Sequence, residues 1–271
     1  MSNNKVLSGL GIYVYGLASA IAGLFDFIWG DFDASHQPIQ ALGDNIPGVK
    51  IFAYITAFWM VAGGVAILWR RSARAGAAAL AGIYLIFAMF WLPRFYTAPH
   101  YLGMRIPVYI GVFTGMGTQL IVCAAGALVY ASLAMGGSLW PRTVLAVRWI
   151  FGVCSIAFGL GHLTNVHDNI VYVPKWMPLG QEFWVIVTGT CFVLAGIAIL
   201  TGILDALAAW LLGLQFLAFN LLILPSFILA DPHDHAAWGG SAYNLAAVGA
   251  AWILADQLAR SKPGRQDRES S

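Results

Sequence analysis

The sequence predicts an all-α fold, a polytopic membrane helix bundle of eight transmembrane helices arranged as two parallel four-helix repeats. Of its 271 residues, 60% are hydrophobic and only 10% are charged, whereas a soluble domain carries roughly 25% charged residues. Apolar stretches of about 20 residues recur, which is the length that an α-helix needs to cross the hydrocarbon core of a bilayer. The chain also matches itself when it is shifted by about half its length.

Eight apolar stretches are each long enough for one helical crossing. They are residues 7–30, 50–69, 75–93, 107–132, 143–165, 182–203, 206–229 and 238–259. They lack the alternation of apolar and polar residues that strands of a membrane barrel require, so helices are predicted throughout.

The basic residues indicate the orientation of these helices. If the N-terminus is cytoplasmic, the cytoplasmic segments carry ten lysines and arginines and the outer segments only Lys50, Arg94, Arg105 and Lys175. Cytoplasmic loops of membrane proteins are enriched in basic residues, so we expect both termini in the cytoplasm of a bacterial inner membrane. The net charge of +2 is too small to suggest nucleic acid as a partner.

An internal repeat divides the chain into two predicted units and a tail. A shift of 132 residues aligns residues 50–98 with 182–230 and gives fourteen identities without a gap, and a shift of 136 aligns the first helix with the fifth. We therefore predict a first repeat over 1–134, a second over 135–260 and a disordered cytoplasmic tail over 261–271. Because each unit holds an even number of helices, the units should be related by a pseudo-twofold axis along the membrane normal.

The first and fifth helices share a stripe of small residues that ends at an ionisable residue. Gly16, Ser19 and Gly23 precede Asp26, and the matching residues Gly152, Ser155 and Gly159 precede His162. Small residues three and four positions apart occupy one helix face and allow close packing of two helices in lipid.

Asp26 and His162 are the main site candidates, because an ionisable group inside a membrane helix is unfavourable without a partner. We expect them at equal depths near the outer boundary, each directed into the protein. One interpretation is a proton-linked or ligand-binding pair that faces a cavity between the halves. The other is simple hydrogen bonding near the outer headgroups.

Other polar residues gather at the same predicted end. Asn165 and Glu182 could complete a pocket, although Glu182 also suits the positive end of its own helix dipole. The outer Arg94 is a further candidate for ligand binding or proton transfer. His233 and His235 are weak metal candidates, because two histidines in a short loop are more often solvated than ligating.

The second half contains a recognisable series of short motifs. It runs Gly161-His162-Leu163, then 173–178 (VPKWMP), then Phe183-Trp184 and Thr188-Gly189. This series resembles the DoxX-like family of bacterial membrane proteins, most strongly over residues 150–225. Family members are typically four-helix units, so the chain resembles two fused units. The first half departs from the pattern, since Asp26 replaces the histidine.

The resemblance implies a membrane or quinone-side subunit of a redox or stress-related complex, with quinone as a possible cofactor and a redox protein as a partner beside the lipid membrane. A quinone site predicts an apolar, aromatic-lined cleft near Asp26 or His162. A small-molecule or ion transporter, the first alternative, predicts a polar cavity near the midplane with discontinuous helices. A non-catalytic assembly factor, the second, predicts neither. Whether the chain is an enzyme stays open.

Overall fold

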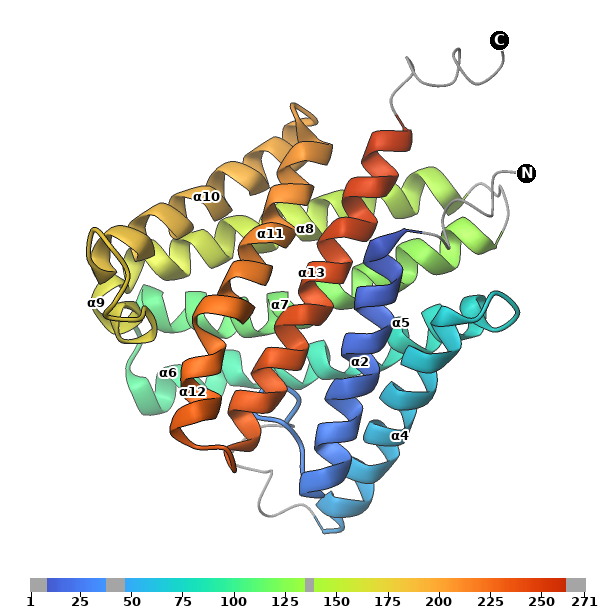
Figure 1. Cartoon of the computed structure of the whole chain (residues 1–271), viewed down its shortest axis with the longest axis horizontal. Helices are drawn as coiled ribbons and strands as arrows, with labels where there is room; N and C mark the ends of the chain where they lie inside the picture. The colour runs from blue at the N-terminus through green and yellow to red at the C-terminus, as the bar shows by residue number, and fades with distance from the viewer. Residues whose placement is uncertain (1–8, 38–46, 135–138, 262–271) are drawn as a thin grey trace.

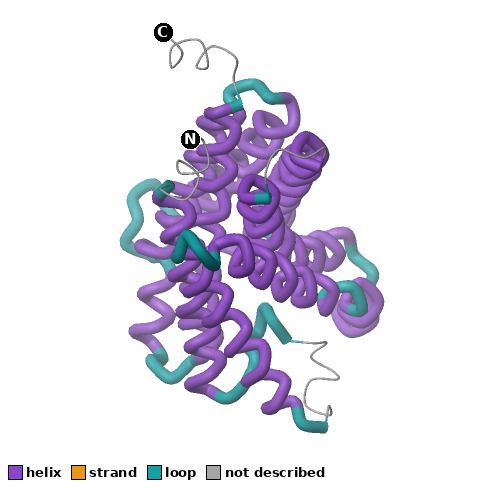
Figure 2. The backbone as a smooth tube through the Cα atoms, turned by 90° about the vertical axis from the view of Figure 1, so that its right-hand side faces the viewer, coloured by secondary structure: helices purple, strands orange, loops and turns teal. Residues whose placement is uncertain are grey.

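The computed structural model describes residues 9–37, 47–134 and 139–261, and within these ranges all regular structure is helical (Figure 1). The helices are α2 (Leu10–Trp29), α4 (Val49–Leu68), α5 (Ala73–Phe90), α6 (Arg94–Leu102), α7 (Ile106–Leu133), α8 (Leu139–Thr164), α9 (Val166–Asn169), a 3-10 turn (Ile170–Tyr172), α10 (Gln181–Thr201), α11 (Asp205–Leu222), α12 (Leu224–Ala230) and α13 (His235–Arg260). Figure 2 shows the same chain from the side, as long helices joined by loops.

Glycine and proline set several helix ends. Gly30 and Gly202 end α2 and α10 in the left-handed conformation, which glycine adopts without a steric penalty. Pro93 stands at the break between α5 and α6, and Pro225 lies in the first turn of α12, directly after the break that follows α11. Proline cannot continue the backbone hydrogen bonding of a preceding helix, which accounts for a break at each position. The two prolines are separated by the 132-residue shift of the internal repeat, so the breaks fall at matching places in the two halves.

Seven of the described helical segments are long and apolar enough to span a membrane, so the chain is a multi-pass membrane protein. The eighth predicted span coincides with α13, which has 26 residues but is not among the seven. Its glycines, Ser241, Tyr243 and Asn244 lower its hydropathy. That α13 also crosses the membrane stays a prediction.

The helices contact one another in the same order in both halves. In the first half α2 packs on α4, α4 on α5 and α5 on α7, and in the second half α8 packs on α10, α10 on α11 and α11 on α13. The halves meet where α7 packs on α8, where α13 packs on α2, and where α13 packs on α7. A pseudo-twofold axis would produce this pattern, and the superposition of residues 9–132 on 145–258 stays a prediction.

The predicted stripes of small residues form the closest helix contacts. A Cβ atom added to Gly64 would lie 2.5 Å from the Gly16 carbonyl oxygen, and one added to Gly196 would lie 2.5 Å from the Gly152 carbonyl oxygen. The α2–α4 and α8–α10 seams therefore bring backbone against backbone, which is the close approach that small residues allow in lipid.

Helix α13 is the most enclosed helix of the bundle, with 15 of its 26 residues buried. It lies between α11 and α2 in Figure 1 and also contacts α7. Its packing against α2 is again close, because a Cβ atom on Gly249 would lie 2.4 Å from the backbone nitrogen of Tyr15. A helix covered by protein on several sides can hold polar residues that a lipid-facing helix avoids.

The start of α2 and the end of α13 lie at the same end of the bundle, since Ile12 and Arg260 line one small crevice. Asp26, near the end of α2, lies beside His235 at the start of α13, toward the opposite end of both helices. His162, near the end of α8, shares a cavity wall with Asp234 and Ala236 at the same start of α13. The predicted tail, 261–271, falls outside the described residues apart from Ser261.

Candidate functional site

Asp26 lies near the end of α2, fully buried, and is surrounded by three partners. Its Oδ2 is 3.4 Å from Nδ1 of His36, and its Oδ1 is 3.2 Å from Nε2 of His235. The backbone N–H of Asp33 donates to Oδ1 at 3.0 Å. Removing a carboxylate from water is unfavourable unless opposite charges and hydrogen bonds compensate, and this cluster supplies both.

His36 lies in the loop after α2, outside the membrane-spanning segments. Burial favours its neutral form, but the hydrogen bond and charge of Asp26, together with the charge of Asp33, outweigh burial and raise the pKa of His36 above its ordinary value. An imidazolium at this position then pairs with the Asp26 carboxylate. The second imidazole, that of His235, stacks on the Trp29 ring with 4.9 Å between the ring centroids.

The loop that carries His36 is fixed to helices of the first half. The Ser35 carbonyl accepts hydrogen bonds from Nε1 of Trp91 at 3.0 Å and from Nε2 of Gln119 at 3.2 Å. Arg94 donates to the Gln37 carbonyl at 3.0 Å, and its guanidinium lies over the Trp91 ring, 4.0 Å from the centroid. Arg94, a predicted site residue, therefore holds this loop in place.

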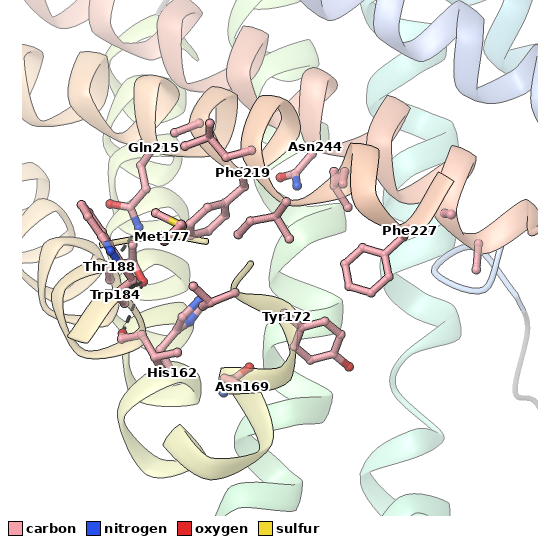
Figure 3. A pocket seen from close by; sticks show the side chains of 18 of the residues that line it. His162, Asn169, Tyr172, Met177, Trp184, Thr188, Gln215, Phe219, Phe227 and Asn244 are labelled. Atoms are coloured by element: carbon pink, nitrogen blue, oxygen red, sulfur yellow. Dashed lines mark hydrogen bonds between the residues drawn. The ribbon is translucent and has the colours of Figure 1, made fainter. Parts of the chain in front are cut away.

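The second half contains a cavity beside His162, whereas in the first half the loop residue His36 lies beside Asp26. A cavity of about 530 Å³ lies beside His162, within the roughly 300–1,000 Å³ of small-molecule sites. Its wall is mainly apolar and aromatic and includes Met177, Trp184, Val185, Phe219, Leu222 and Phe227 (Figure 3). The polar side chains on the wall are His162, Asn169, Tyr172, Thr188, Gln215, Asp234 and Asn244.

The position of His162 is set by its neighbours. Its Nδ1 is 2.8 Å from the Phe158 carbonyl, one turn earlier in α8, and its ring stacks on Phe219 at 6.0 Å. A Cβ atom added to Gly189 would lie 2.9 Å from the Cβ of His162, so the absence of a side chain at Gly189 makes room for the imidazole. The shared stripe of α8 therefore ends at the cavity wall.

The self-match of the chain explains the difference between the halves. It pairs Phe87 with Phe219, and each of these rings carries a stacked imidazole. In the second half that imidazole belongs to His162 on the helix. In the first half Asp26 takes the matching helix position, and the loop residue His36 supplies the ring over Phe87, at 4.3 Å. The first-half loop thus fills the place that stays open in the second half.

The structure does not bring Asp26 and His162 together. Both side chains point into the protein, but Asp26 does not line the cavity beside His162. The interpretation of the two residues as one pair facing a shared cavity is therefore wrong. The first turn of α13 lies between the two environments, because His235 contacts Asp26 while Asp234 and Ala236 line the cavity.

Asn165 and Glu182 do not line the cavity. The Asn165 amide nitrogen donates to the Gly161 carbonyl at 3.4 Å, in the last turn of α8. The asparagine on the cavity wall is Asn169. Glu182 is exposed in the first turn of α10, a position where a carboxylate favours the helix dipole.

His233 and His235 were weak metal candidates, and the structure places them in different surroundings. The His233 side chain is exposed, and its carbonyl accepts a hydrogen bond from Nε1 of Trp29 at 3.1 Å. Across the described ranges, no group of three or more histidine, cysteine or acidic side chains is placed to hold a metal ion. The sequence did not identify His36 and His235 as the partners of Asp26. The available signal was that a buried carboxylate needs a cation and that histidines cluster at this end.

Comparisons of this chain with protein-family models, with curated proteins and with solved structures find no match. The resemblance to the DoxX-like family therefore rests on the residues of the second half alone. Those residues coincide with much of the cavity wall, since Val173, Met177, Trp184 and Thr188 belong to both.

Proposed function

We propose that this chain is a DoxX-like protein of the bacterial inner membrane, with both termini cytoplasmic, that binds a quinone or a similar ring-bearing lipid beside His162. In this role it acts as the membrane or quinone-side subunit of a redox or stress-related complex. The observation that supports the proposal is the apolar, aromatic-lined cavity of about 530 Å³, which has the His162 imidazole and a few other polar side chains on its wall. Such a wall suits an apolar ring and tail, with polar contacts reserved for a head group.

A transporter is the second candidate. The matching breaks before α6 and before α12 favour it, because interrupted helices at equivalent places in two repeats often mark a transport site. Phe227 and Leu224 of α12 line the cavity, so one break lies at the proposed site. Two observations weigh against transport of a polar solute: the wall is mainly apolar, and His162 is only two residues from the end of α8.

The proposal is tested by measuring bound quinone. The protein is purified in mild detergent, extracted with organic solvent and analysed by mass spectrometry, and binding of a decyl-chain quinone is followed by quenching of tryptophan fluorescence, since Trp184 lines the cavity. We expect Ala218→Trp, which fills the cavity, to abolish both signals. Leu211→Trp on the same helix is the matched control, because Leu211 is 52% exposed and does not line the cavity.

Absence of quinone from the native protein, together with no saturable quenching by the added quinone, would overturn the proposal. Equal quenching in the Ala218→Trp and native proteins would place the quinone elsewhere.

A further inference from the structure

The polar end of the cavity has a consistent chemical character, which begins with His162. Its Nδ1 lies 2.8 Å from the Phe158 carbonyl oxygen. A carbonyl oxygen can only accept, so Nδ1 carries the proton of this hydrogen bond. No carboxylate among the described residues forms an ion pair with His162, and its ring packs between Phe192 and Phe219. In the neutral imidazole that results, Nε2 has no proton and is a hydrogen-bond acceptor.

Thr188 and Asn169 have used all of their side-chain donors, whereas Gln215 has used one of its two amide N–H groups. Nε2 of Gln215 donates to the Thr188 carbonyl at 3.0 Å, and the Thr188 hydroxyl donates to the Trp184 carbonyl at 2.7 Å. Nδ2 of Asn169 donates to the carbonyls of Gly161, at 3.1 Å, and Asn165, at 2.9 Å. Thr188 and Asn169, which line the cavity, therefore keep only acceptor oxygens, and Gln215 keeps its oxygen and one N–H.

The single donor of Trp184 is also used, since its indole N–H donates to the Pro178 carbonyl at 2.7 Å. These groups belong to one neighbourhood. Gly189 contacts the Cβ of His162 and directly follows Thr188, to which Gln215 is bonded, and Asn169 is bonded to Gly161, the residue before His162. Figure 3 shows Thr188, Gln215 and His162 on one side of the cavity, with Asn244 and the Tyr172 hydroxyl, which keep their donors, on the other.

We propose that the His162 end of this cavity selects a hydrogen-bond donor, so that the preferred ligand carries a hydroxyl group on an apolar ring or chain. This inference rests on the proposed function and deepens it: among quinone-like ligands, the site prefers the hydroquinone over the quinone. A quinone carbonyl is itself an acceptor and meets only acceptors at His162, Thr188 and Asn169. A hydroxyl group satisfies one of them, and a buried polar group left unpaired is unfavourable. An isoprenoid alcohol presents the same head-group chemistry.

The test uses probes that share one apolar body and differ in the head group. They are a decyl-chain hydroquinone under argon, its dimethyl ether and its quinone, with farnesol and its methyl ether as the alcohol pair. Affinities are measured with the full-length protein in detergent by equilibrium dialysis and mass spectrometry. We expect the hydroquinone to bind at least about fivefold more tightly than its ether or quinone, as the net value of one hydrogen bond implies.

His162→Phe keeps an aromatic ring over Phe219 but removes the acceptor. We expect this variant to lose the preference, with all three ring probes within about twofold of one another. His167→Phe is the matched control, because His167 is exposed in α9 and does not line the cavity. Should His162→Phe fail to fold, as judged by size-exclusion chromatography, Thr188→Val removes a second acceptor with little change of shape and should also reduce the preference.

The outcomes separate this inference from the proposed function. Binding of all ring probes with equal affinity, or tighter binding of the quinone, would overturn the proposed preference for hydrogen-bond donors and leave a quinone-type site intact. If no ring probe binds but farnesol binds more tightly than its methyl ether, the preference for hydrogen-bond donors is supported and the quinone assignment is overturned. No binding of any probe would overturn both.

Discussion

Replacing Asp26 with Asn removes the negative charge that faces His36 and His235. The substitution keeps the shape of the side chain and an oxygen that can accept from the Asp33 amide. Both imidazoles lie beside the buried Asp26 carboxylate. We therefore expect the free energy of unfolding to fall by roughly 3–5 kcal/mol, the value for removing one partner of a buried ion pair.

The loss should depend on pH in a defined direction. The pKa of His36 is raised in the folded protein, so its protonation stabilises the fold below the ordinary histidine pKa of about 6.5, and this contribution disappears as the pH rises through the raised value. The difference in stability between the native protein and Asp26→Asn should therefore be largest near pH 5.5 and smaller near pH 9.

Reversible unfolding in mixed micelles at both pH values measures this difference. Asp31→Asn is the matched control, because Asp31 is exposed five residues further along the chain and should change stability by less than about 0.5 kcal/mol. A difference that is independent of pH, or that grows as the pH rises, would refute the assignment of the charge pair to Asp26 and His36.

Three further predictions concern the cavity, the helix seams and the topology. Gly189→Ala should displace His162 and weaken ligand binding at least about tenfold, whereas Gly240→Ala, whose added Cβ meets nothing within 4 Å, should leave dialysis affinities unchanged. Gly64→Ala and Gly196→Ala should each lower stability by about 1–3 kcal/mol in the same unfolding assay, while Gly82→Ala, with 3.6 Å to its nearest neighbour, should not; unequal losses at Gly64 and Gly196 would argue against equivalent seams. A C-terminal reporter fusion should report the cytoplasm, and activity of a reporter that works only outside would reverse the assigned orientation.

The sequence predicted the elements that lipid dictates. The apolar stretches gave helices at all eight places, and the glycines of the repeated stripe were correctly interpreted as a packing device, since Gly16 meets Gly64 and Gly152 meets Gly196. Both follow from local rules, namely the length of an apolar run and the spacing of small residues on one helix face.

The site was predicted only in part, because loop paths are not encoded in periodicity. Asp26 and His162 were identified from their unfavourable positions inside helices, but the two histidine partners of Asp26 come from a loop and from a distant helix. His235 lies 209 residues after Asp26, and His36 reaches it only because Trp91 and Gln119 fix the intervening loop. The equivalence of Asp26 and His162 in sequence also suggested equal roles for them. In the structure the loop with His36 covers Asp26 in the first half, whereas a cavity lies beside His162 in the second.

The enclosed, less apolar helix α13 has a consequence for biosynthesis. It follows all seven strongly apolar spans along the chain, so the ribosome delivers it after them. With fewer apolar residues, it gains less from the bilayer than the other helices do and more from α2, α11 and α7, which must already be in place to receive it. Its packing against them then completes the bundle and brings His235 to Asp26 and Asp234 to the cavity wall. A nascent chain that has not yet received α13 would therefore lack both environments and expose the small-residue faces of α2 and α11 to the membrane's quality-control proteases.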